Sequence, residues 1–292
     1  MAASKFAKRR VDVTFTIGSG DNGEGTPSTV TLTGLRVSAN IVKAGGASLG
    51  NGQLRILGMT LSQMNQVSTL GLAVTVVRKN TVSVTAGDDD SGMALVFEGT
   101  IFDAWADFQG APEVMFNVVA STGLYDAVKP VPPSSYSGGA DAAVIMSNLA
   151  EQMGMSFENS SVSVQLSNPY FPGTAREQAE RCAKAADINM IMDDKTLAIW
   201  PKGRARGTEK VSLSPDTGMV GYPTYTSKGI AVTCLFNPSI RFGGKIEVKS
   251  SLTPACGEWI VQTLAHSLES ETPGGAWFTS LTAGRQGYVG VS

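Results

Sequence analysis

The sequence predicts a mainly β protein with a small α+β insert. Residues 11–120 and 209–285 alternate apolar and polar residues in short runs separated by turns, which is typical of strands. Between these stretches, residues 140–201 change to apolar residues at helical spacing followed by a hairpin pattern. The chain has 292 residues, of which 42% are hydrophobic, so it can bury the core of one large domain or of several small ones.

The first β module carries one short helix among its strands. Alternation runs through residues 11–17, resumes at 30–32 and changes phase at Gly34, where we expect a β-bulge. A possible N-cap at Thr60, apolar residues at every third position and a stop at Gly71 predict the helix. Further strands are expected at 35–41, from 54 onward, and at 73–77, 81–85, 93–104 and 113–120, a spacing that suits an antiparallel sheet closed into a small barrel.

Residues 124–139 are the clearest linker. Their prolines, Pro130, Pro132 and Pro133, predict neither a helix nor an interior strand in this segment. The Ser/Gly tail that follows the prolines is of a flexible type.

A small α+β module follows the linker. Residues 140–153 have apolar residues at helical spacing, and Gly154 stands where a helix C′ glycine is expected. Thr174 and Glu177 match a capping box, which predicts that a second helix begins there. A hairpin pattern completes the module, with strands at 188–192 and 196–200 and a turn at 193–195.

The rest of the chain predicts a second β module. Strands are expected at 219–225, 230–236, 245–252, 258–270 and 277–283. The domain plan is therefore a β-barrel-like module at 1–123, a linker at 124–139, an α+β module at 140–208 and a C-terminal β module at 209–292.

Charge and cysteine content argue against several classes of protein. The net charge of −2 does not suggest a protein that coats nucleic acid. The basic start at 5–10 is expected to be a solvated arm, with docking on a partner as the alternative.

Cys182, Cys234 and Cys256 are far apart and odd in number, so we expect buried thiols rather than disulfides or a metal site. No apolar run approaches the ~20 residues of a membrane helix.

Two acidic clusters are candidates for cation binding. Asp88, Asp89 and Asp90 lack the ligand spacing, the central glycine and the distal glutamate of a calcium loop. Asp193 and Asp194 lie at the turn of the predicted hairpin. We therefore expect both clusters to be solvated acidic turns.

The single histidine limits histidine-based chemistry to one position. On a strand, His266 shares a face with Leu264 and Leu268, so we expect a packed, hydrogen-bonded side chain rather than a catalytic base. The sequence thus predicts no catalytic, cofactor-binding or metal-binding residue.

Basic and aromatic residues give no nucleic-acid signature. The basic residues of 202–206 are expected on a solvated loop, with contact to an acidic partner as the alternative. The tryptophans are too scattered for a base-stacking platform and are expected in core or interface packing: Trp105, Trp200, Trp259 and Trp277.

A series of segments in the last 80 or so residues carries a resemblance. In order, these are Gly218-Met-Val-Gly-Tyr-Pro223, Gly229-Ile-Ala-Val-Thr-Cys-Leu-Phe-Asn-Pro238, Gly243-Gly-Lys-Ile-Glu-Val-Lys-Ser250, residues 259–269 with His266, and Gly275-Ala-Trp277. This order resembles the baseplate hub subunits of contractile-tailed bacteriophages, whose modules are related to the base of type VI secretion spike proteins.

The resemblance implies an assembly and a set of partners. Such hubs are homotrimers on the tail axis, and each subunit carries two β-barrel-like modules, so that a pseudo-six-fold ring joins the six-fold tail tube to the three-fold central spike. The implied partners are the spike, the tail tube proteins, the tape measure protein and baseplate wedge proteins, with no membrane, cofactor or specific nucleic acid. The implied location is the virion tail baseplate, after assembly in the host bacterial cytoplasm. The sequence shows no repeat between residues 11–120 and 209–285.

Two other functions stay open at this point. A tail-associated cell-wall polysaccharide hydrolase would need a carboxylate pair, and none stands out among the 25 acidic residues. A glycan-binding module would be built on residues 140–201. Because sheet edges must be paired, covered or charged, a β protein without convergent polar residues better suits a ring-forming building block.

Overall fold

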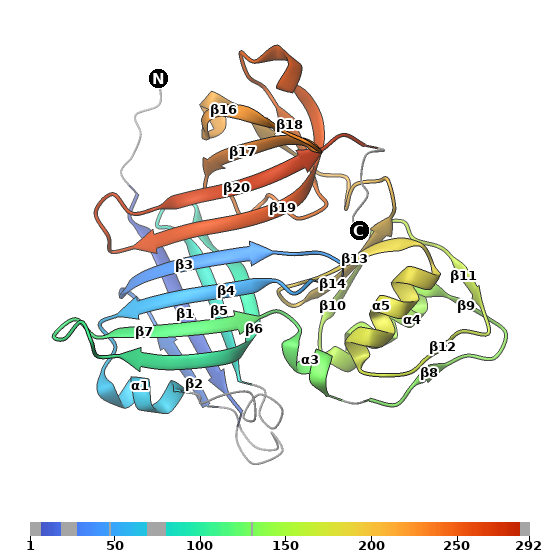
Figure 1. Cartoon of the computed structure of the whole chain (residues 1–292), viewed down its shortest axis with the longest axis horizontal. Helices are drawn as coiled ribbons and strands as arrows, with labels where there is room; N and C mark the ends of the chain where they lie inside the picture. The colour runs from blue at the N-terminus through green and yellow to red at the C-terminus, as the bar shows by residue number, and fades with distance from the viewer. Residues whose placement is uncertain (1–6, 19–27, 47, 69–79, 130, 287–292) are drawn as a thin grey trace. The chain divides into compact units, whose positions relative to one another are not determined.

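The computed structural model describes residues 7–18, 28–46, 48–68, 80–129 and 131–286. The chain divides into two units, each with its own packing. Unit 1 comprises Met1–Ile41, Gly52–Ser121 and Ser267–Trp277, and unit 2 comprises Val42–Asn51, Thr122–His266 and Phe278–Ser292. Most elements are strands, so the predicted mainly β class is confirmed (Figure 1).

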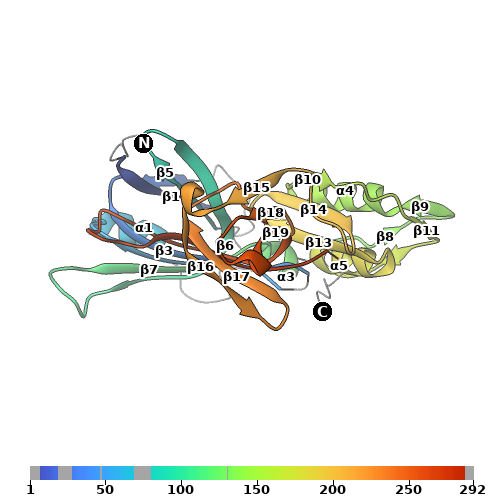
Figure 2. The same ribbon diagram turned by 90° about the horizontal axis from the view of Figure 1, so that it is seen from above.

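Unit 1 is a β-sheet with one helix. Its strands lie in the hydrogen-bonded order β3-β4-β7-β6-β5-β1-β2. The bounds are β1 (Arg9–Ile17), β2 (Ser28–Leu32), β3 (Arg36–Lys43), β4 (Asn51–Leu57), α1 (Leu61–Val67), β5 (Thr81–Asp88), β6 (Gly92–Asp107) and β7 (Met115–Ser121). The tip of the β6–β7 hairpin reaches beyond the ends of β3 and β4 in both views (Figures 1 and 2).

Alternating apolar residues build the core of unit 1. In β1 the buried side chains are Val11, Val13 and Phe15, the face that the sequence pattern predicts. The rings of Phe15 and Phe116 meet edge to face with their centroids 6.4 Å apart. Large aromatic side chains from different strands thus fix the register of the sheet, because a slip by one residue would expose them.

Two details of unit 1 differ from the prediction. Gly34 has a φ of 68° in a bend between β2 and β3, so the predicted β-bulge is wrong. The phase of the alternation changes there because the chain leaves one strand and starts another. Among the described strands, no pairing closes the sheet into a barrel, and the predicted strand at 73–77 lies outside the described residues.

The helix α1 begins where the sequence predicts. Thr60 caps it and forms a capping box with Gln63. The helix ends at Val67, and Gly71, the predicted stop, lies outside the described residues. Met64 and Val67 are its buried residues.

The α+β part of unit 2 packs two helices against a three-stranded sheet in the order β10-β14-β13. Both predicted helices, the Thr174 capping box and the hairpin are confirmed. The elements are α4 (Ala142–Met153), β10 (Ser156–Asn159), α5 (Ala175–Ala185), β13 (Ile188–Asp193) and β14 (Thr196–Pro201), with the short ribbons β8 (Ser134–Ser135) with β12 (Tyr170–Phe171) and β9 (Gly139–Asp141) with β11 (Gln165–Ser167).

The predicted linker segment is not free of helix. α3 (Leu124–Val128) precedes its prolines, and the prediction that the segment contains no helix is therefore wrong for these residues. A proline disfavours helix at the residue before it and not several residues earlier, which leaves Leu124–Val128 free to turn. The division into four segments stays a prediction.

The C-terminal β region, most of which belongs to unit 2, contains the five predicted strands and one more. These are β15 (Lys210–Leu213), β16 (Met219–Thr226), β17 (Gly229–Leu235), β18 (Lys245–Val248), β19 (Gly257–Ser270) and β20 (Trp277–Gly284), with the short helical turns Pro215–Thr217 and Thr253–Ala255. The order is β16-β17-β20-β19, and β18 pairs with both β15 and β19. β18 ends four residues before the predicted boundary at 252.

Candidate assembly surfaces and the buried charge network

A buried network of charges holds the insert in unit 2. Lys43 Nζ donates to Asp193 Oδ1 at 2.8 Å and to Asp194 Oδ1 at 2.5 Å. On the other side of Asp193, Arg206 Nη1 lies 3.1 Å from Oδ2, and Arg206 Nη2 lies 2.8 Å from Glu158 Oε2. Asp193 is therefore held between two cations, and 4% of the Arg206 side chain is exposed.

The network keeps its members charged. Burial acts to lower the pKa of Lys43, but the attraction and hydrogen bonds of Asp193 and Asp194 outweigh it, so the pKa is raised. Burial acts to raise the pKa of Asp193, but Lys43 and Arg206 outweigh it, so the pKa is lowered. The hydrogen bond from Arg206 likewise holds the pKa of Glu158 below its usual value.

Two predictions from the sequence are wrong here. Asp193 and Asp194 do form the hairpin turn, but their carboxylates bind Lys43 and are largely buried instead of solvated. Arg206, expected on a solvated basic loop, is buried as well, whereas Lys202 stays exposed and pairs with Asp187. The partners lie up to 151 residues apart in the chain, so no local pattern reports them.

The turn between β3 and β4 is fixed to the insert by backbone contacts too. The Gly46 amide donates to the Met190 carbonyl at 3.0 Å. A Cβ at Gly45 would collide with the Phe242 ring, and Phe242 in turn packs edge to face on Trp200 at 6.3 Å. The insert hairpin is thus anchored within unit 2 by charge, hydrogen bonding and ring packing together.

His266 is a packed residue of the sheet, as predicted. It is 3% exposed, its ring meets the Phe236 ring edge to face at 5.5 Å, and Nδ1 lies 3.0 Å from the Thr279 hydroxyl. The Thr279 hydroxyl also accepts from the Asn237 amide at 3.1 Å. Burial lowers the pKa of His266 to about 4, which leaves the ring neutral near pH 7.

The other candidate residues have structural surroundings. Asp88 accepts from the amides of Asp90 and Ser91, so the first acidic cluster is a turn, as predicted. Cys182 and Cys234 are buried, and burial raises the pKa of Cys182 to about 12, whereas Cys256 is half-buried. In the described part of the chain, no group of three or more His, Cys, Asp or Glu residues could hold a metal ion. The absence of catalytic and cofactor residues stays a prediction.

The structure also describes part of the N-terminal basic segment and all four tryptophans. Lys8 is exposed and pairs with Glu271. Arg9 and Arg10, which the sequence predicts in a solvated arm, instead begin β1, and Arg9 lies over the Trp277 ring at 5.6 Å. Trp200, Trp259 and Trp277 are buried, whereas Trp105 is 40% exposed. The structure has no helix, among the residues it describes, that is long and apolar enough to cross a membrane.

One sheet region of unit 2 is free of charge. The strands β16, β17 and β20 contain no Asp, Glu, Lys or Arg. Leu235 and Phe278 lie opposite each other in the register of β17 and β20 and are 46% and 36% exposed. Val220, on the neighbouring β16, is 44% exposed. Depletion of charge around exposed apolar side chains is typical of the core of a protein interface.

Each unit ends in an uncharged strand edge. Among the described strands, β16 pairs only with β17, and β2 pairs only with β1. Neither strand contains a lysine, the residue with which soluble proteins often protect such edges, although β16 has Pro223 and a register shift between Val220 and Thr224. Exposed tyrosines, Tyr222 and Tyr225, also lie on β16.

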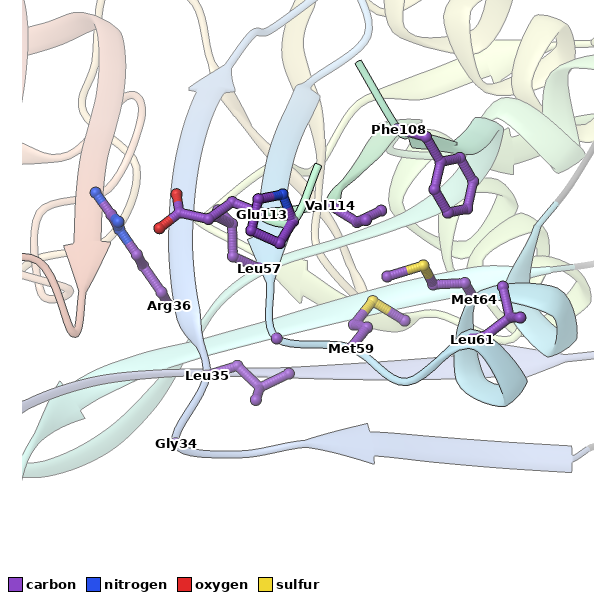
Figure 3. Close-up of a pocket in the computed structure, with 12 residues that line it drawn as sticks. Gly34, Leu35, Arg36, Leu57, Met59, Leu61, Met64, Phe108, Glu113 and Val114 are labelled. Carbon is purple, nitrogen blue, oxygen red and sulfur yellow. The ribbon is translucent and has the colours of Figure 1, made fainter. Parts of the chain in front are cut away.

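Unit 1 carries an apolar hollow beside α1. Its volume is about 620 Å³. Leu61 and Met64 of α1, Met59 before it and Phe108 after β6 line its apolar side (Figure 3). Arg36 belongs to its rim.

Comparison with known proteins identifies the chain. A family model for the baseplate hub gp41 matches residues 10–275. The chain belongs to the baseplate hub gp41 family. It is accordingly a structural component of a phage tail baseplate, and the resemblance in the C-terminal segments is confirmed. A comparison with curated protein sequences gives no significant match.

Solved structures show that the fold of this baseplate hub family member also occurs elsewhere. The 43 kDa tail protein of prophage MuSo2 from Shewanella oneidensis matches with a TM-score of 0.59 and 10% identity, over 95% of this chain and 97% of that one. A tail protein from Neisseria meningitidis MC58 matches with a TM-score of 0.59 and 9% identity, over 94% and 97%. The E. coli c3393 protein, a component of the type VI secretion system, matches with a TM-score of 0.55 and 8% identity, over 97% and 75%.

Proposed function

We propose that this baseplate hub is a homotrimer that adapts the six-fold tail tube to the three-fold central spike of a contractile tail. Three copies of a chain with two units supply six units around the axis, which matches a six-fold partner on one side and a three-fold partner on the other. The observation that carries the proposal is the family match over residues 10–275.

The uncharged strand edges support cyclic assembly. Among the described strands, one edge strand in each unit, β16 in one and β2 in the other, has a single partner, which gives every copy two different surfaces that a neighbour can cover. Contacts between unlike surfaces close into a ring when the rotation allows it, and a closed ring stops growing. The charge-free strands β16, β17 and β20 supply the apolar contact area that such an interface needs.

The proposed partners follow from this role. The central spike and the tail tube proteins would bind the two faces of the ring, and the tape measure and wedge proteins would contact the hub during assembly in the host cytoplasm. The hub itself performs no catalysis in this proposal. Cell-wall zymography tests that part, because clearing by the isolated protein would favour a hydrolase.

Native mass spectrometry tests the trimer. The chain is measured alone and co-expressed with the spike protein, both at micromolar concentration. We expect a mass of three chains, or of three chains bound to a spike trimer. A monomer in both preparations would contradict the proposal.

A further inference from the structure

Strand β6 places two carboxylates on either side of an exposed indole. Asp103, Trp105 and Asp107, here called the acidic triplet, occupy alternate positions of the strand. Alternate side chains of a strand point to the same face of the sheet. Ala104, which lies between them, is fully buried, whereas Trp105 is 40% exposed, so the face that carries the triplet points outward.

The acidic triplet borders a hollow of about 600 Å³. Trp105 and Asp107 line this hollow together with Gln109 and Phe108, and the Phe108 side chain is 55% exposed. Asp107 Oδ1 accepts from the Gln109 amide at 2.9 Å, but neither Asp103 nor Asp107 forms an ion pair with any residue that the structure describes. The two negative charges of the triplet are therefore not neutralised by a described side chain.

The electrostatic surroundings favour a cation in this hollow. Residues 80–128 include eight acidic residues and no lysine or arginine. A guanidinium group combines the two interactions that the triplet offers, because it stacks on an indole and forms paired hydrogen bonds with a carboxylate. The chemistry of the hollow is therefore that of a site for an arginine side chain.

The chain carries an exposed arginine in a segment of the opposite charge. Residues 195–208 contain four basic residues and no acidic residue. Within this basic loop, Arg204 is exposed and forms no ion pair with the described part of the chain. Lys202 pairs with Asp187, and Arg206 is buried in the charge network, so the loop is held on both sides of Arg204. Holding the loop in advance reduces the entropy that is lost when Arg204 binds.

The two charged surfaces are complementary and belong to different units. The acidic triplet lies in unit 1 and Arg204 lies in unit 2, so every copy carries one acidic site and one basic loop. Two copies can therefore bind through unlike surfaces, and contacts between unlike surfaces close into a ring when the rotation allows it. Complementary charges also select the partner and fix the register of such a contact.

We infer that the acidic triplet of one copy binds Arg204 of the next copy, with the guanidinium group stacked on Trp105 and paired with Asp103 and Asp107. This inference rests on the proposed homotrimer. It adds to the uncharged strand edges a charged contact that determines which surfaces of neighbouring subunits meet.

A charge exchange between the two surfaces tests the inference. The variants are Asp103→Arg, Arg204→Glu and the double variant that carries both substitutions. Arg181→Glu is the matched control, because Arg181 is also exposed in unit 2 but lies on α5, beside Glu177 and Glu180. Sedimentation velocity measures the dissociation constant of the trimer for each variant, and biolayer interferometry measures binding to purified spike protein and to purified tail tube protein.

Each single exchange places like charges opposite each other, so we expect it to weaken the trimer by about tenfold or more. The double variant restores an opposite pair and should return to within about threefold of the parent protein, which also shows that the exchanged residues allow folding. The control should change the dissociation constant less than about twofold.

Three results would overturn the inference. The single variants could form the trimer as tightly as the parent protein, or the double variant could fail to recover it. The single variants could also keep the trimer and lose binding to the spike or tube protein, which would assign the hollow to that partner. In each of these cases a trimeric parent protein leaves the proposed function standing, whereas a monomeric parent protein would contradict the proposed function and this inference together.

Discussion

Lys43 Nζ lies 2.8 Å from Asp193 Oδ1, and only 7% and 12% of the two side chains are exposed. A buried ion pair of this kind costs desolvation on both sides, so it adds less stability than its Coulombic energy suggests. Removing one partner is strongly destabilising, because the other charge then stays buried without compensation. The pair therefore fixes where the insert hairpin lies in unit 2 and makes the fold sensitive to either substitution.

The first prediction concerns this pair. Asp193→Asn removes the charge that Lys43 and Arg206 share, and we expect it to lower the free energy of unfolding by about 3–5 kcal/mol. The matched control is Asp187→Asn, since Asp187 pairs with Lys202 at the surface, where both side chains are more than half exposed. Surface pairs are screened by water, so the control should lose no more than about 1 kcal/mol. Urea titration of both variants makes the comparison, and equal losses would contradict the buried network.

The second prediction concerns pH. The folded pKa of His266 is lowered to about 4, below its usual 6.5. Between these values the unfolded chain binds a proton that the folded chain does not, so stability must fall as the pH falls from about 6.5 to about 4. The total loss should be on the order of 3 kcal/mol, at about 1.4 kcal/mol per pKa unit.

His266→Gln makes the pH prediction specific. His266 is the single histidine of the chain, so the variant should remove most of the stability change in that pH range. The carboxylates of Asp193 and Glu158 have lowered pKa values, so their contribution is lost only as the pH falls below the usual carboxylate range. Urea titrations at several pH values test this. If the free energy of unfolding fell equally steeply with pH in the parent protein and in His266→Gln, groups other than His266 would cause the pH dependence.

The third prediction concerns the start of α5. The Thr174 hydroxyl accepts from the Glu177 amide at 3.3 Å, and Glu177 Oε2 accepts from the Thr174 amide at 3.1 Å. Thr174→Ala should cost about 1 kcal/mol of unfolding free energy, because the amide loses its cap. Glu177→Gln keeps an acceptor at the same place and should cost clearly less. Chemical denaturation measures the loss of unfolding free energy in both variants. Equal losses would contradict the role of the Thr174 hydroxyl as the cap of α5.

The fourth prediction concerns the uncharged edge at β16. Val220→Lys adds the kind of residue that keeps strand edges apart, so it should lower the trimer fraction at micromolar concentration several-fold. Val144→Lys, on the exposed side of α4, is the control and should leave the fraction unchanged. Analytical ultracentrifugation gives the fractions. If Val220→Lys stayed fully trimeric, β16 would not be part of the subunit interface.

The sequence predicts most helices and strands of this chain, but few of the tertiary contacts between them. Alternation identifies the core face of β1 and of β19, including His266, because period-two burial is a local property. The capping box at Thr174 is local as well and is found where predicted. The sequence does not indicate the helix α3, because the three following prolines dominate the composition of that segment.

The buried charges show the opposite case. Asp193 lies in an acidic hairpin turn, and the neighbouring residues in the sequence predict that it is solvated. It is buried because it pairs with Lys43, which lies 150 residues earlier in the chain. The hollow beside α1 is likewise formed by Leu61 and Phe108, which no sequence period connects. Sites made by segments far apart in the chain require the tertiary structure.

Cryo-electron microscopy of the intact tail tests the central claim most directly, since it counts the copies of the chain and shows their place. We predict three copies in one ring on the axis, with tube subunits on one face and the spike on the other. A ring of six copies, or copies lying away from the axis, would contradict the account.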